Sequence, residues 1–143
     1  MKNKPELRID KFGNKRWYLN NKLHRIDGPA VEYAYGNKYW YLNGKLHRED
    51  GPAFEGVNGA KDWYLNGLLH RKDGSAIIWK DGSKFWYLNG KRHRIDGPAI
   101  EYKSGNKEWY LNGKKVNEED VIIKAVLTER EYLDFVINLK EIL

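Results

Sequence analysis

Short apolar runs and polar turn signals alternate along the chain with a fixed period. The unit Ala30–Gly51 illustrates the pattern. Residues 30–33 form a short run of strand-forming residues, and residues 38–42 (Lys-Tyr-Trp-Tyr-Leu) form a second one. Gly36 and Asn37 between the runs tolerate positive φ, so the chain is predicted to reverse there and to pair the two runs as an antiparallel hairpin.

Two more turn signals follow the second run. Asn43-Gly44 is a strong hairpin signal, so residues 45–47 are predicted to begin a third short strand. The turn cluster at residues 50–52 (Asp-Gly-Pro) then leads into the next unit. Because side chains alternate across a strand, Trp40 and Leu42 are predicted to face the side of the sheet opposite to the neighbouring tyrosines.

The unit recurs at constant spacing. Five tryptophans stand 23 residues apart with no insertion between them: Trp17, Trp40, Trp63, Trp86 and Trp109. Such a period indicates a repeat architecture, in which stacked copies bury the Trp and Leu of one hairpin against the next. The predicted fold is therefore mainly β, an elongated antiparallel β-hairpin array of five copies over residues 1–116, with the first and last copies incomplete.

The pattern changes after the fifth hairpin. Asn117 and the three acids that follow it are typical of a helix start, which predicts a short helix over residues 121–127. A capping-box sequence at 128–131 opens a second helix. Residues 117–143 are thus predicted to be a helical cap that forms one structural unit with the array. The apolar face of the second helix either covers the last hairpin or forms a homodimer or docking surface; its residues are Tyr132, Phe135, Val136, Leu139 and Ile142.

A His-Arg-x-Asp motif follows each of the first four hairpins and supplies every histidine of the chain. One histidine per copy lacks the close ligand spacing of zinc sites, and no serine or cysteine recurs beside it as a nucleophile, so neither an enzyme nor a cofactor is expected. Two interpretations stay open: a structural ladder, in which Arg pairs with the Asp of its own or the next copy and with an aromatic ring, and a binding face. The motif residues are His24, Arg25, Asp27, His47, Arg48, Asp50, His70, Arg71, Asp73, His93, Arg94 and Asp96.

The sequence 90–93 (Gly-Lys-Arg-His), followed by Gly97, Tyr102, Gly105 and Trp109, resembles the membrane-occupation-and-recognition-nexus (MORN) repeat. The resemblance spans residues 7–115, and it implies a hairpin array that serves as a binding scaffold. The chain departs from the family where Arg25 and its three equivalents replace the Gly that usually follows His. The motif His-Arg-x-Asp-Gly-Pro-Ala also resembles the repeats of small proteins of tailed phages and large DNA viruses. That similarity implies a non-enzymatic accessory protein, an inhibitor that binds and blocks a host or defence protein in the host cytoplasm.

Charge adds an alternative function. The net charge is +6, and one lysine per copy follows the Gly-x turn, which predicts a basic edge interrupted by glutamates: Lys15, Lys38, Lys61, Lys84 and Lys107. Basic stripes with interleaved aromatics can bind nucleic acid, nucleotides or anionic phospholipid. A protein partner is the first expectation, nucleic acid or nucleotide the second, and a membrane surface the third. The chain has no cysteine, which excludes disulfides and fits a reducing compartment such as the cytoplasm.

Overall fold

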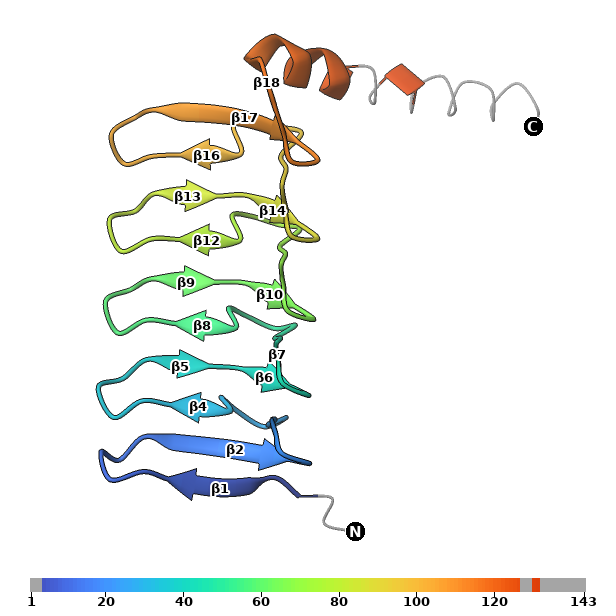
Figure 1. Ribbon diagram of the computed structural model, residues 1–143. Helices are drawn as coiled ribbons and strands as arrows, with labels where there is room; N and C mark the ends of the chain where they lie inside the picture. The colour runs from blue at the N-terminus through green and yellow to red at the C-terminus, as the bar shows by residue number, and fades with distance from the viewer. Residues whose placement is uncertain (1–3, 127–129, 132–143) are drawn as a thin grey trace, which may run out of the picture.

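The computed structural model describes residues 4–126 and 130–131, and its hairpins stack into an elongated array (Figure 1). All strand pairs in the described residues are antiparallel. The described part of the chain has 18 strands, and the main sheet is open rather than closed into a barrel. The predicted β-hairpin array is therefore confirmed.

The main sheet has twelve strands and runs the length of the array. In spatial order it contains β1 (Glu6–Ile9), β2 (Lys15–Leu19), β4 (Val31–Glu32), β5 (Lys38–Tyr39), β8 (Phe54–Glu55), β9 (Lys61–Asp62), β12 (Ile77–Ile78), β13 (Lys84–Phe85), β16 (Ile100–Glu101), β17 (Lys107–Leu111) and β18 (Lys114–Val116), with β3 (Lys22–Leu23) paired to β2. Successive strands in space are also successive in sequence, apart from the small hairpins described next. Each 23-residue unit therefore adds its strands directly beside those of the preceding unit, as in other repeat proteins.

A small hairpin follows the main-sheet strands of each internal copy. These hairpins are β6 (Tyr41–Leu42) with β7 (Lys45–Leu46), β10 (Tyr64–Leu65) with β11 (Leu68–Leu69), and β14 (Tyr87–Leu88) with β15 (Lys91–Arg92). Asn43 has φ 51° and Gly44 has φ 80°, the left-handed backbone that a two-residue hairpin turn requires. The predicted Asn-Gly turn and third strand are confirmed.

The register of the main sheet places two rows of residues on opposite faces. The first, which we call the central row, contains Arg16, Val31, Tyr39, Phe54, Asp62, Ile77, Phe85, Ile100 and Glu108. The second, the charged row, contains Lys15, Glu32, Lys38, Glu55, Lys61, Ile78, Lys84, Glu101 and Lys107. Neighbouring residues of a strand point to opposite faces, so the two rows cannot share a side.

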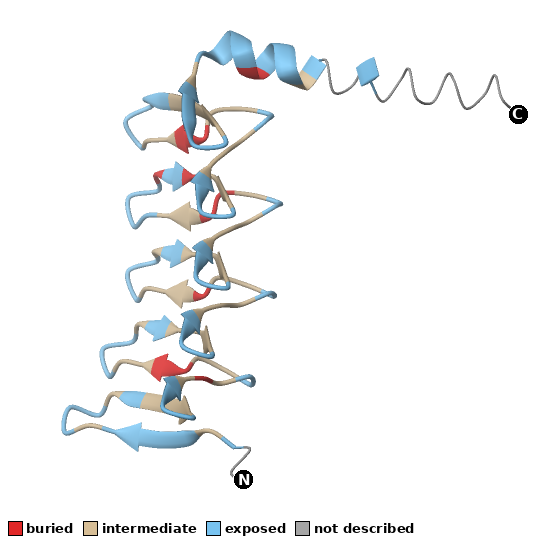
Figure 2. Cartoon of the chain, turned by 45° about the vertical axis from the view of Figure 1, so that its right-hand side comes forward, coloured by how far each residue is buried: buried red, intermediate tan, exposed pale blue. Residues whose placement is uncertain are grey.

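The buried core is thinner than the tryptophan pattern predicts. The residues with no exposed surface are four alanines, Ala30, Ala53, Ala76 and Ala99, and one large residue, Ile100, while the rest of the array is mostly half-buried or exposed (Figure 2). Trp40 and Leu42, expected to be buried between copies, are only half-buried. The reason is that the loop after each hairpin covers the Trp with an arginine rather than with a neighbouring apolar side chain.

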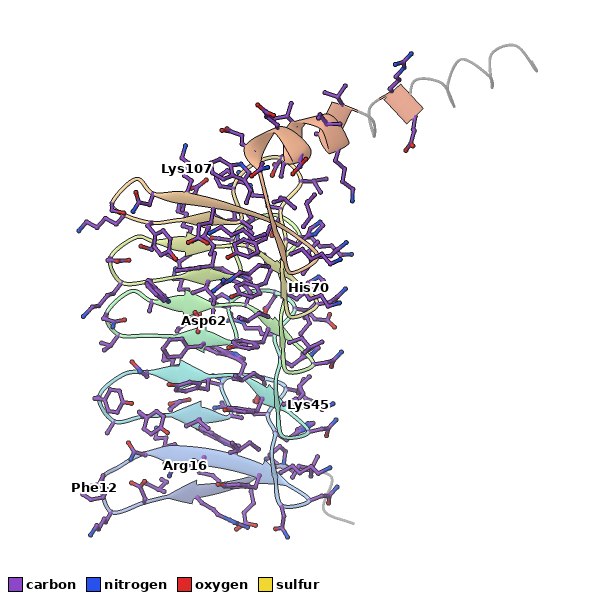
Figure 3. All side chains as sticks on the ribbon, turned by 45° about the horizontal axis from the view of Figure 1, so that its top comes forward. Phe12, Arg16, Lys45, Asp62, His70 and Lys107 are labelled. Carbon is purple, nitrogen blue, oxygen red and sulfur yellow. The ribbon has the colours of Figure 1, made fainter. Side chains whose placement is uncertain are left out.

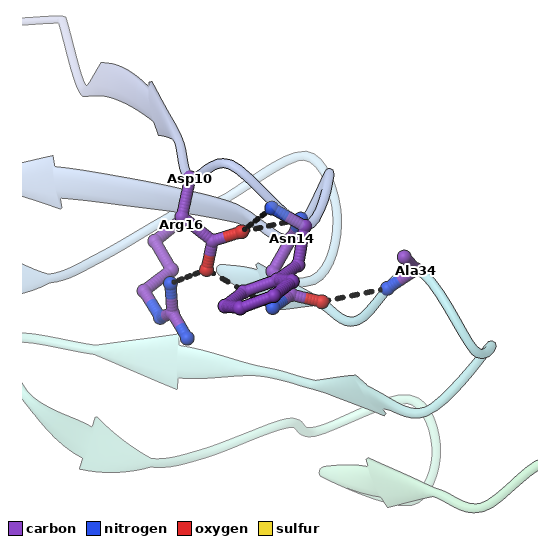
Figure 4. A network of polar contacts seen from close by, with 5 residues as sticks. Asp10, Asn14, Arg16 and Ala34 are labelled. Atoms are coloured by element: carbon purple, nitrogen blue, oxygen red, sulfur yellow. Dashed lines mark hydrogen bonds and ion pairs between the residues drawn. The ribbon is translucent and has the colours of Figure 1, made fainter.

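Side chains at the hairpin tips also join successive copies. Asn14 Oδ1 accepts a hydrogen bond from the Ala34 N–H at 2.9 Å, beside an Asp10 carboxylate that accepts from Arg16 at 2.9 Å (Figure 4). This ion pair lowers the pKa of Asp10 to about 2. Asn37 and Ser83 make the equivalent links to the N–H groups of residues 57 and 103, at 3.0 Å each. The third copy has Ala60 at this position and therefore cannot make the link.

A helix begins at residue 118, at the end of the array (Figure 1). Residues 118–126 are helical, and the Asn117 N–H donates to the Asp120 carboxylate at 3.1 Å, one half of a capping box. Val121 is only 3% exposed, in a hollow shared with Trp109 and Pro98. The predicted helix start at Asn117 is confirmed, and the acids at 118–120 form the first turn, three residues before the predicted range 121–127. The predicted apolar face at residues 132, 135, 136, 139 and 142 lies outside the described residues.

Candidate functional site

The guanidinium of each His-Arg-x-Asp motif lies over the tryptophan ring of its own copy. In the second copy the Arg48 guanidinium is 4.0 Å from the centre of the Trp40 ring. Its Nε donates to Asp50 at 2.9 Å, and its Nη1 donates to the Pro52 carbonyl at 3.2 Å and to Glu55 at 2.8 Å. Arg25, Arg71 and Arg94 have the same ring distance of 4.0 Å. The arginine therefore holds its own loop in place and, through Glu55, also ties that loop to the next copy.

Histidine makes one side-chain link between copies, and the arginine makes another through the glutamate of the next copy, as in Arg25–Glu32, Arg48–Glu55 and Arg94–Glu101. His47 Nδ1 accepts a hydrogen bond from the Asn66 N–H at 3.0 Å, and the same pairing joins His24 to Asn43, His70 to Asn89 and His93 to Asn112. All four Arg–Asp pairs lie within one copy: Arg25 with Asp27, Arg48 with Asp50, Arg71 with Asp73 and Arg94 with Asp96.

Shallow grooves separate successive motif loops. The groove between the first two loops has a volume of about 700 Å³, with Ile26 and Asp27 on one wall and Trp40, His47 and Arg48 on the other. The next two grooves measure about 600 and 590 Å³. Within the described residues, no group of three or more His, Asp or Glu side chains could hold a metal ion, and no buried side-chain nitrogen or oxygen lacks a hydrogen-bond partner. The motif atoms are thus already engaged in holding the loops.

The five lysines stand in one row of the main sheet, together with the glutamates that the sequence predicts to interrupt it. They lie in interior strands of the main sheet, and each of the five is directly opposite at least one glutamate. The Lys15–Glu32 ion pair spans 4.0 Å. The antiparallel register brings the Lys that follows one turn beside the Glu that precedes the next, so the stripe predicted from sequence alternates in sign. The exception is Ile78, which stands between Lys61 and Lys84.

The central row presents aromatic rings on the opposite face, and the sequence reasoning above did not single it out as a site. Tyr39 packs on Phe54 with ring centres 4.7 Å apart, and Tyr33 meets Tyr39 edge-on at 5.8 Å. Farther along the row, the ring centre of Phe85 lies 4.5 Å from that of Trp79 and 5.9 Å from that of Tyr102. The helix at residues 118–126 lies at the end of the array, away from these rings (Figure 1). The sequence signal for this row was the alternation along residues 38–42, because it predicted that the tyrosines share one face of the sheet.

Asp62 is the one acidic residue in the middle of the central row (Figure 3). Phe54 and Ile77 are its cross-strand neighbours. Burial among these groups raises the pKa of Asp62 to about 6. No hydrogen bond or ion pair of this carboxylate occurs within the described residues. The neighbouring Tyr64 also has a raised pKa, chiefly through its own burial and secondly through the charge of Asp62.

Compared with known proteins, the chain matches no family model and gives no significant match to a curated protein. In the part of the chain that the structure describes, no helix is long and apolar enough to span a membrane.

Proposed function

We propose that the chain is a non-enzymatic interaction protein that binds another protein through the face bearing the central row. The observation that supports this proposal is the presence of two clusters of aromatic rings on one face of the sheet, one made by Tyr33, Tyr35, Tyr39 and Phe54 and the other by Trp79, Phe85 and Tyr102. At the hairpin tips, Tyr35 is 60% exposed and Trp79 is 49% exposed. Aromatic side chains supply large, stiff contact areas and are enriched in protein interfaces. In the viral setting implied by the motif resemblance, the partner is a host or defence protein that is blocked by occupancy.

The motif loops are the other candidate binding face, and their polar groups are already engaged within the array. Their guanidinium groups each contact a ring, a carboxylate and a carbonyl oxygen of the array, as Arg48 does. A ligand that recruited these donors would first have to break those contacts. The loops therefore serve to stiffen the array, which lowers the entropy lost when the opposite face binds.

The alternative, an electrostatic binder of nucleic acid, nucleotide or phospholipid, relies on the charged row. Glu32, Glu55 and Glu101 alternate there with the lysines, which weakens the attraction for a polyanion. Salt separates the two functions, because binding through phosphate contacts weakens steeply from low to moderate ionic strength, whereas binding through aromatic rings changes little.

The decisive experiment places a photo-crosslinking amino acid on either face. Position 35 lies beside the central row, since Tyr35 stacks on Tyr33 at 5.1 Å, and position 38 is an exposed member of the charged row three residues away. We expect a specific protein adduct from position 35 and none from position 38 when the crosslinker is activated in the producing cell. An adduct from position 38 alone, or one made of nucleic acid or lipid, would refute the proposal.

A further inference from the structure

We propose that Asp62 and the rings beside it bind a cationic side chain, arginine or lysine, of the protein partner. This inference rests on the proposed function and specifies which chemistry the central row recognises. The occupant is thus a basic residue on the partner's surface, seated in the middle of the array.

The repeat itself shows that Asp62 is a departure from the pattern. Its equivalents at the same phase of the period are Arg16, Tyr39, Phe85 and Glu108. Arg16 is paired with Asp10 at 2.9 Å, and Glu108 with Lys115 at 3.0 Å. The two equivalents in the flanking copies are rings. Of the three charged residues at this phase, only Asp62 has no partner among the described residues, although an aromatic residue there would continue the row.

The surroundings of Asp62 are suited to a cation. Phe54 and Ile77 flank it across the strands, and Tyr64 lies close enough for the two groups to influence each other's charge. Gly56 leaves the tip side of the row without a ring, where the other internal copies have Tyr33, Trp79 and Tyr102. A cation at this place would meet a carboxylate directly and the negative faces of the neighbouring rings.

Other kinds of occupant are disfavoured by the same groups. An apolar side chain seated here would bury the carboxylate further without a partner, which is costly. An anion would be repelled by it. Only a cationic side chain offsets the negative charge that burial makes unfavourable. Asp62, which departs from the repeat, would therefore be stabilised by binding.

Few other titratable groups face Asp62. Tyr39 and Tyr64 do, and the pKa of each is raised above 10, chiefly by its own burial, so both are neutral near pH 7. On the adjacent strands β8 and β12 the residues that face it are Phe54 and Ile77, while Glu55 and Lys61 lie on the opposite face. Binding of a cation should therefore follow the ionisation of Asp62 and weaken as the pH falls below about 6.

The test uses two small probes that differ only in charge, N-acetyl-arginine amide and its neutral isostere N-acetyl-citrulline amide. The full chain is titrated with each probe, and binding is followed by NMR signals of the Asp62 carboxyl group and the Tyr64 ring. We expect the arginine probe to bind, to lower the pKa of Asp62, and to bind roughly tenfold more tightly than the citrulline probe. N-acetyl-lysine amide should behave like the arginine probe.

Two variants and one control complete the experiment. Asp62→Asn keeps the shape and should remove the preference for the arginine probe, and Asp62→Phe, which copies the residue at position 85, should remove binding of both probes. Lys38→Ala, on the opposite face, should leave binding unchanged. Equal affinity of wild type for the two probes, or a preference that survives Asp62→Asn, would overturn the inference. Crosslinking at position 35 is read separately, so a protein adduct that forms without any arginine preference would leave the proposed function standing and remove only this inference.

Discussion

Replacing Asp62 by asparagine should make the folded chain more stable at neutral pH. Burial holds the pKa of this carboxyl at about 6, against 3.8 in an exposed setting. A carboxyl with a raised pKa takes up a proton on folding, so the folded state is favoured at low pH and loses stability as the pH rises from about 3.8 to about 6. Asparagine has the same shape and no charge, and it therefore mimics the protonated form.

The size of the effect follows from the pKa difference. Fully expressed, that difference corresponds to about 3 kcal/mol. Asp62 is partly exposed, and solvent screening reduces the effect, so we expect a gain of about 1–2 kcal/mol for Asp62→Asn at pH near 7. Near pH 4, where the wild-type carboxyl is protonated in the folded chain, the two proteins should differ by less than about 0.5 kcal/mol.

Urea unfolding followed by tryptophan fluorescence, at several pH values between these limits, measures this difference. Asp10→Asn is the matched control, because its carboxylate has a lowered pKa of about 2 and should change stability with the opposite sign: the substitution destabilises at neutral pH, and its effect fades as the pH falls from about 3.8 towards 2. If Asp62→Asn has the same effect on stability at pH 4 and pH 7, or lowers stability at pH 7, the reasoning about this carboxyl is wrong.

Three further substitutions test how the array is held together, each by unfolding in denaturant. Arg48→Ala should lower the free energy of unfolding by about 1–3 kcal/mol, because Trp40 loses the guanidinium packed on its ring and the loop loses its hydrogen bonds to that group. An unchanged denaturation midpoint would show that these contacts do not stabilise the array. Ala60→Asn should gain about 0.5–1 kcal/mol by supplying the tip link to residue 80 that the third copy lacks; no protection of the residue 80 amide against hydrogen exchange would contradict this. Val121→Ala should cost about 1–2 kcal/mol and raise the solvent quenching of Trp109 fluorescence, whereas equal quenching in both proteins would mean that the helix does not cover the last hairpin.

The period of 23 residues determined most of the fold. Asn43-Gly44 can adopt the left-handed turn with little strain, and its equivalents recur at the same phase, so each copy forms the same small hairpin whatever surrounds it. The alternation along residues 38–42 similarly assigned the tyrosines and the tryptophan to opposite faces before any packing was known. These features are local, and local preferences suffice to specify them.

The pairing between copies was decided only in the folded array. The partner of His47 is Asn66, 19 residues away, and the glutamate opposite Lys38 on the next copy is Glu55. Nothing in a single hairpin fixes the register of one copy against the next, so the sequence could predict that glutamates interrupt the lysine row but not which glutamate stands opposite which lysine. The environment of Asp62 has the same origin, since Phe54 and Ile77 come from two neighbouring strands. A side chain's burial, and hence the pKa of its carboxyl, depends on neighbours that only tertiary packing brings together.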